Sequence, residues 1–148
     1  ATNTAGMCYG STSTTSRMKL FGIEDFWGNA WEWIDGLFCD SSRNIKTALE
    51  GSFNDTGNGY TSRGQGATSD ISGYLSKPQG TTETGFIAKE VSGSSTTYFA
   101  DYTNLFAGGL PIFGGNWSNG TYAGAFNLSV GYPASSSYSY VGARLMYL

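Results

Sequence analysis

The hydrophobic positions of this chain fall in short runs separated by glycine, serine and asparagine, and the spacing of a long amphipathic helix is not sustained. Runs rich in aromatic and β-branched residues predict strands at residues 85–91, 96–99, 126–130 and 140–148. The best candidates for helix are residues 45–50 and parts of 18–27, while polar, glycine-rich stretches predict loops at 51–66 and 80–85. The pattern predicts a mixed α+β domain with few helices, short strands and long irregular loops.

The length of 148 residues fits one ordinary domain. Residues 1–17 are mostly threonine, serine, glycine and alanine, so we expect a poorly anchored lead-in followed by a domain over residues 18–148. The chain begins with Ala1 and has no signal-peptide core, which indicates a piece of a longer protein.

Charge and residue types exclude several classes of function. The net charge is −3, with 8 basic against 11 acidic residues, so the surface has no excess of cations for a nucleic acid. No apolar run is long enough to predict insertion into a membrane. Histidine is absent, which removes serine–histidine and cysteine–histidine catalysis and most zinc and non-haem iron sites.

Two cysteines, Cys8 and Cys39, are too few for a disulfide framework or a four-thiolate metal site. One bridge that closes the first forty residues and two separate buried thiols are both compatible with the sequence.

Three of the four tryptophans lie within seven residues, and Trp31 and Trp33 flank Glu32 as a strand would place them. The two rings would then share one face and the carboxylate would lie on the other. Glu32 could be a catalytic acid paired with Asp25 or Asp35. We favour a structural role, in which Glu32 is a buried and hydrogen-bonded carboxylate and the tryptophans are framework, because buried polar groups are normally satisfied anchors.

After Asp101 the sequence contains one charged residue, Arg144. Residues 115–140 consist largely of serine, glycine, asparagine, alanine and tyrosine, the composition of antibody binding loops. Tyrosine supplies broad contact area at low entropic cost, and the small polar residues supply adaptable hydrogen bonds. Composition alone is equally compatible with half-buried tyrosines in edge strands.

Three motifs resemble one known family. They are Trp-Gly-Asn-Ala-Trp-Glu-Trp at 27–33, Gly-Gly-Asn-Trp at 114–117 and Val-Gly-Ala-Arg-Leu at 141–145. Together they resemble the formylglycine-generating-enzyme branch of the C-type lectin fold, and within it most closely the variable proteins of diversity-generating retroelements of phages and gut bacteria. The resemblance implies a C-type lectin-like fold with short antiparallel strands and a variable region over about 114–145.

The enzymes of that superfamily need residues that this chain lacks. Formylglycine-generating enzymes hold copper with a cysteine pair near the C-terminus, but no cysteine follows Cys39. The related iron-dependent sulfoxide synthases need a histidine triad, and the chain has no histidine. We therefore expect a binding protein and no enzyme. The alternatives are an enzyme with a carboxylate-based site around Glu32 and a purely structural tail or pilus module.

In the retroelement family, randomised adenines in asparagine codons yield tyrosine, serine, glycine and aspartate but never tryptophan, methionine, lysine or glutamate. By likeness to this pattern, the ligand-binding variable positions are Ser118, Asn119, Tyr122, Asn127, Ser129, Gly131, Tyr132, Ser136, Tyr138 and Tyr140, with the two asparagines as the less certain members. The predicted framework positions are Trp31, Glu32, Trp33, Trp117, Phe126, Leu128, Val141 and Arg144, and Arg144 is expected to clamp backbone carbonyls or an acid such as Glu32.

No cofactor is expected. Asp55 and Asp70 could join carbonyls around a structural calcium ion, as in other members of the superfamily, but they lack the spacing of a calcium loop, and we favour solvated acids. The predicted partner is a protein or glycan receptor on a target cell. The domain would bind it from a phage tail tip or a bacterial surface. An oligomer could form through the parent protein.

Overall fold

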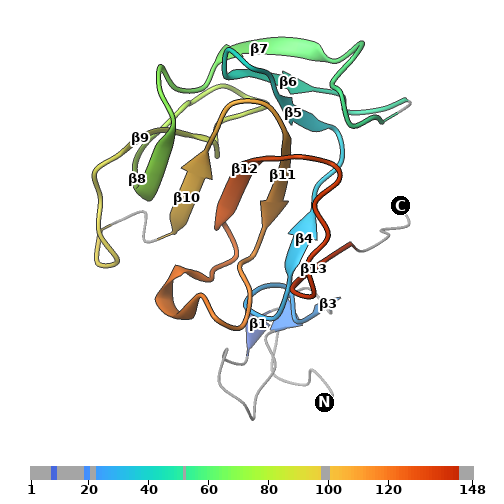
Figure 1. The fold of residues 1–148 in the computed structure, drawn as a ribbon. Coiled ribbons are helices and arrows are strands. Elements are labelled where there is room, and N and C mark those ends of the chain that lie inside the picture. Colours follow the sequence, from blue (N-terminus) through green and yellow to red (C-terminus); the bar gives the residue numbers. More distant parts are fainter. Residues whose placement is uncertain (1–7, 10–18, 21–22, 52, 98–100, 144–148) are drawn as a thin grey trace.

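The computed structural model describes residues 8–9, 19–20, 23–51, 53–97 and 101–143. A seven-stranded sheet forms its centre (Figure 1). Its strands run in the order β13-β4-β11-β12-β10-β8-β9, and neighbours are antiparallel except β10 with β12 and β13 with β4. The bounds are β4 Trp31–Trp33, β8 Ile71–Pro78, β9 Ala88–Val91, β10 Tyr102–Leu105, β11 Leu110–Phe113, β12 Leu128–Tyr132 and β13 Val141–Gly142.

Two smaller sheets complete the fold. One joins β1 (Cys8–Tyr9), β2 (Lys19–Leu20) and β3 (Ile23–Glu24), and the other joins β5 (Leu37–Cys39), β6 (Asn44–Thr47) and β7 (Thr61–Gln65). Figure 1 shows the β5-β6-β7 sheet above the central strands. A pair of backbone hydrogen bonds between Cys39 and Gly109, of 2.8 and 2.9 Å, joins β5 to the segment just before β11.

The hydrophobic core lies between the seven-stranded sheet and the β5-β6-β7 sheet. Leu105 pairs with Val130 and Leu128 with Thr103, so these side chains share one face of the large sheet. They pack against residues of the smaller sheet in one buried cluster. Its members are Leu37, Cys39, Ile45, Ala67, Ile87, Leu105, Leu128 and Val130. We call this side of the large sheet the core face.

The structure is mostly β. Within the described residues it contains no α-helix, only one short 3₁₀ helix, η1 (Gly120–Tyr122). The helix predicted at 45–50 is wrong, because Ile45 and Thr47 point into the core from strand β6 and alternate with partly exposed neighbours. The helix predicted within 18–27 is wrong where residues are described, since β2 and β3 lie there.

The strand predictions are confirmed in part. Trp31–Trp33 is a strand, residues 88–91 of the predicted 85–91 form β9, and the predicted 126–130 overlaps β12. Thr96 and Thr97 lie in a turn instead of a strand, and residues 98–99 and 144–148 are outside the described residues. The loop predicted at 80–85 is confirmed, whereas the one at 51–66 contains β7.

Cys39 is a free thiol, so it does not form the disulfide bridge that the sequence left open. The side chain is fully buried in the core. Burial raises the pKa of the Cys39 thiol to about 11.

Candidate ligand-binding surface

The three motifs of the sequence analysis meet around β4. Gly28 N–H donates to the Gly114 carbonyl at 3.1 Å, and Trp31 N–H donates to the Tyr140 carbonyl at 2.8 Å. Glu32 pairs with Phe113 on β11 and with Gly142 on β13. The tryptophan segment therefore lies inside the large sheet, and both later motifs hydrogen-bond to it.

The face of the large sheet opposite the core carries a row of polar and aromatic side chains. Cross-strand pairing aligns Ser72, Asn104 and Ser129, and the row continues through Ile112 to Trp33. Ser72 Oγ donates to Asn104 Oδ1 at 2.6 Å, and Asn104 Nδ2 donates to Ser129 Oγ at 3.2 Å. This chain of hydrogen bonds fixes the three side chains against one another. We call this side the aromatic face because tyrosine and tryptophan rings gather at both ends of the row.

One ring cluster lies at the β8 end. Tyr74 and Tyr102 are cross-strand partners with ring centroids 5.2 Å apart, and Tyr122 of η1 packs on Tyr102 at 4.5 Å. Tyr74 and Tyr102 follow the alternation of Ser72 and Asn104, which places them on the aromatic face. The Tyr122 side chain is 46% exposed. We name these three rings the Tyr122 cluster.

The other ring cluster lies at the β4 end. Tyr138 and Tyr140 stack with centroids 5.1 Å apart and planes 6° from parallel, and Trp117 meets Tyr140 edge-on at 6.4 Å. We name these three residues the Tyr140 cluster. Trp117 is 60% exposed and Tyr138 is 47% exposed, so broad ring surface faces solvent here.

Tyr132 joins this cluster to the sheet. Its ring meets Trp33 edge-on at 6.4 Å. Burial raises the pKa of Tyr132, the nearby Tyr140 and Tyr138 hydroxyls add to the effect, and a hydrogen bond with Ser129 opposes it. The half-buried Tyr132 is therefore part framework and part surface, whereas Trp117 and Tyr138 are the exposed rings.

Two predicted ligand-binding positions, Asn127 and Ser129, are buried, and a third, Gly131, is partly exposed but leaves no room for a side chain. Asn127 is buried, donates from Nδ2 to the Tyr122 carbonyl, and its Oδ1 has no hydrogen-bond partner among the described residues. Ser129 is buried in the hydrogen-bonded row. Gly131 has φ +112°, and a Cβ there would lie 2.7 Å from Phe106 Cβ. Neighbouring side chains cover these parts of the aromatic face.

The remaining variable positions are at or near the surface. Ser118 is exposed and donates to Asn116 Oδ1, Asn119 Oδ1 accepts from the Asn116 amide at 2.6 Å, and Ser136 is partly exposed in the turn after Pro133. The Asn119 side chain therefore holds the turn that carries Ser118.

Two framework predictions also need correction. Trp117 and Phe126 are exposed, at 60% and 74%, because both lie in loops that leave the sheet. Trp31 and Leu128 are buried, and Trp33 and Val141 are half-buried. Arg144 lies outside the described residues.

The acidic residues do not gather into a metal site within the described part of the chain, where no group of three or more cysteine, aspartate or glutamate side chains could hold an ion. Asp70 pairs with Arg43 Nε at 2.7 Å, and Asp55 is exposed in a turn. Glu32 is buried, at 7% exposure, and it lines neither of the two cavities described next.

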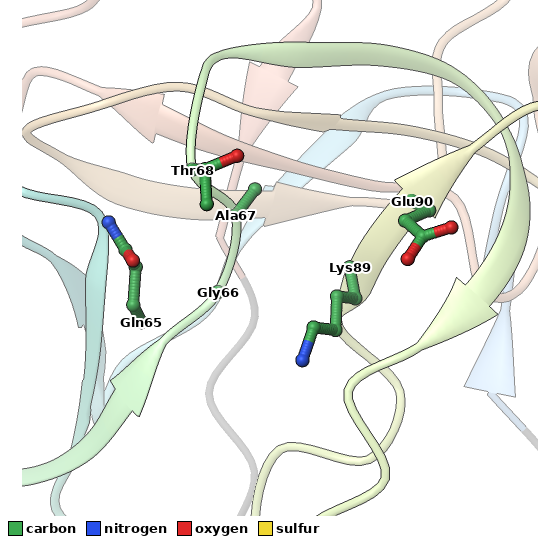
Figure 2. A pocket seen from close by; sticks show the side chains of 6 residues that line it. All are labelled: Gln65, Gly66, Ala67, Thr68, Lys89 and Glu90. Atoms are coloured by element: carbon green, nitrogen blue, oxygen red, sulfur yellow. The ribbon is translucent and has the colours of Figure 1, made fainter.

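The surface cavities formed by the described residues include two of similar size. The first, of about 390 Å³, lies between the end of β7 and strand β9, and Figure 2 shows Gln65, Lys89 and Glu90 around it. Glu90 is paired with Lys77 at 3.1 Å. The second, of about 380 Å³, is lined by Phe86, Asp101 and Phe126 among others. Neither cavity is lined by a predicted ligand-binding position, and Phe126 is the one predicted framework position among their described lining residues.

Sequence reasoning missed four residues of the aromatic face, Ser72, Tyr74, Tyr102 and Asn104. They lie outside the glycine- and serine-rich segment on which the prediction concentrated. The available signal was the two-residue spacing of Ser72 with Tyr74 and of Tyr102 with Asn104, which is typical of side chains on one face of a strand.

Comparison of the chain with protein-family models, with curated proteins and with solved structures found no match in any of the three. Within the residues it describes, the structure has no helix with the length and apolar character needed to cross a membrane.

Proposed function

We propose that this chain is a ligand-binding domain with a C-type lectin-like fold, and that its aromatic face recognises a protein or glycan receptor on a target cell. In this proposal it is a variable protein of a diversity-generating retroelement, carried at a phage tail tip or on a bacterial surface. Binding requires no catalytic group. The rings of the two clusters contribute most of the affinity, because aromatic side chains dominate binding energy at recognition surfaces.

The observation that carries the proposal is the exposure of aromatic rings on an uncharged surface. Trp117, Tyr122 and Tyr138 are all at least 46% exposed, although large rings are costly to leave in water. From Tyr102 to residue 143 the chain has no charged side chain. The four ion pairs between described residues join partners that precede this segment. Exposed aromatic area without charge repulsion suits contact with a partner.

Cell binding tests the proposal. The fluorescently labelled domain is measured by flow cytometry on a panel of intact bacterial cells and in parallel on a glycan array. In the strains or glycans that the wild type binds, the double variant Trp117→Ala/Tyr138→Ala should lose roughly tenfold or more in affinity. Its free energy of unfolding should change by no more than about 1 kcal/mol because both rings are exposed.

Leu49→Ala is the matched control. Leu49 is a large, 78% exposed hydrophobic side chain in the loop after β6, away from the aromatic face. The control should bind as the wild type does. Unchanged binding of the double variant, or an equal loss in the Leu49→Ala control, would contradict the proposal.

A further inference from the structure

The second cavity lies on the side of the large sheet opposite the aromatic face. Its walls include Leu75 of β8 and Thr103 of β10, which alternate along their strands with Tyr74 and Tyr102 and therefore project from the other side. Pro78, Phe86 and Phe126 complete the apolar lining. The volume of about 380 Å³ is within the range of small-molecule sites.

Two features of this cavity indicate a ligand. Phe86 and Phe126 are 53% and 74% exposed at its walls, which leaves ring area available for contact. Asp101 is the one charged residue among the described residues of the lining, and none of the described lysines or arginines forms an ion pair with it. The single hydrogen bond to its carboxylate from a described residue is a long one, 3.4 Å, from the Phe126 amide to Oδ1.

We propose that this cavity binds a small alkylated ammonium ion, such as the trimethylammonium group of choline. The negative faces of aromatic rings attract organic cations, and a carboxylate beside them supplies the opposite charge. The apolar walls of Leu75 and Pro78 suit the methyl groups. An alkylguanidinium group fits less well, because it carries five N–H donors and the described lining offers one carboxylate.

Titration of the domain with choline chloride, followed through its amide ¹H–¹⁵N spectrum, tests this inference. Resonances of the cavity residues should shift at millimolar choline, and sodium chloride at equal ionic strength should not shift them. The neutral carbon isostere 3,3-dimethylbutan-1-ol has the same shape without the charge. The alcohol should bind with an affinity lower than that of choline by a factor of roughly ten or more, because it makes neither the cation–π contact nor the ionic contact with the carboxylate.

Three variants make the test specific. Asp101→Asn keeps an oxygen to accept from the Phe126 amide but removes the charge, and it should weaken choline binding by about tenfold. Phe86→Ala removes an exposed ring and should weaken binding several-fold while the fold stays intact. Tyr138→Ala, on the aromatic face, should leave choline binding unchanged, so failure here and failure of the receptor-binding proposal are distinguishable.

Phosphocholine offered in the same titration separates a headgroup ligand from the free cation, and the tighter of the two identifies the source. Equal binding of the neutral alcohol and choline would overturn the proposal, because the cavity would then be only apolar. So would choline binding that persists unchanged in both Asp101→Asn and Phe86→Ala.

Discussion

Replacing Gly131 with alanine tests whether this residue is a variable surface position or a framework position. Gly131 lies in β12 with φ +112°, a conformation that a side chain adopts at a cost of about 1–3 kcal/mol. The added Cβ would also lie 2.7 Å from Phe106 Cβ and 2.9 Å from the Phe106 carbonyl oxygen, neither of which is the end of a flexible side chain. Overpacking of this kind costs about 1–3 kcal/mol. Gly131→Ala should therefore destabilise the domain by roughly 2–6 kcal/mol.

Urea denaturation followed by tryptophan fluorescence measures this loss, since a lower midpoint at unchanged slope reports stability. Gly142→Ala in β13 is the matched control, because a Cβ there has no neighbour within 4 Å and its φ is not in the left-handed region. The control should lie within about 1 kcal/mol of the wild type. If Gly131→Ala is as stable as this control, Gly131 tolerates side chains, and its assignment to the framework is wrong.

The burial of Cys39 and Ser129 leads to three further predictions. In a Cys8→Ser background, Cys39 should react with a thiol reagent only as fast as the protein unfolds, since it is buried and burial raises its pKa to about 11. The folded state holds the Cys39 thiol proton more tightly than the unfolded state does. The contribution of Cys39 to the free energy of unfolding is therefore fully present below pH 9.0 and declines as the pH rises towards about 11. Cys39→Ala should reduce this decline. Ser129→Tyr places a large ring in the buried row and should lower the free energy of unfolding, measured by urea denaturation, by more than about 2 kcal/mol. Ser118→Tyr, on the surface, should lower it by less than about 1 kcal/mol. Equal losses in the two variants would refute the assigned burial.

The tryptophan strand could be predicted because its alternation is strong: Trp31 and Trp33 flank Glu32, and the structure places them in β4. Strand β6 could not, because its four residues are too few to distinguish a strand period from a helical one. Its identity is decided by tertiary contacts, since Ile45 and Thr47 turn into the core while β5 and β7 pair on either side.

The candidate surface was predicted by composition, and composition does not report burial. Asn127, Ser129 and Gly131 look like surface residues. Asn127 is nevertheless buried just before β12, and Ser129 and Gly131 alternate with Leu128 and Val130 within that strand, which has neighbours on both faces. The core packs against one side, and Tyr122, Asn104 and Phe106 meet the other. The segments that cover this face of β12 include β8, β10 and the loop before β11, which are distant from β12 in the sequence. No local sequence pattern therefore predicts this burial.

The central claim is that the exposed part of the aromatic face is diversified for binding while its buried part is held constant. Sequencing of this gene and its surroundings across a natural population tests it most directly. The claim predicts an adjacent reverse transcriptase and a near-identical template repeat, with substitutions at template adenines in the codons of exposed positions such as Ser118, Tyr122 and Tyr138. The codons of Asn127, Ser129 and Gly131 should be constant. Absence of a template repeat, or equal variation at buried and exposed positions, would contradict the claim.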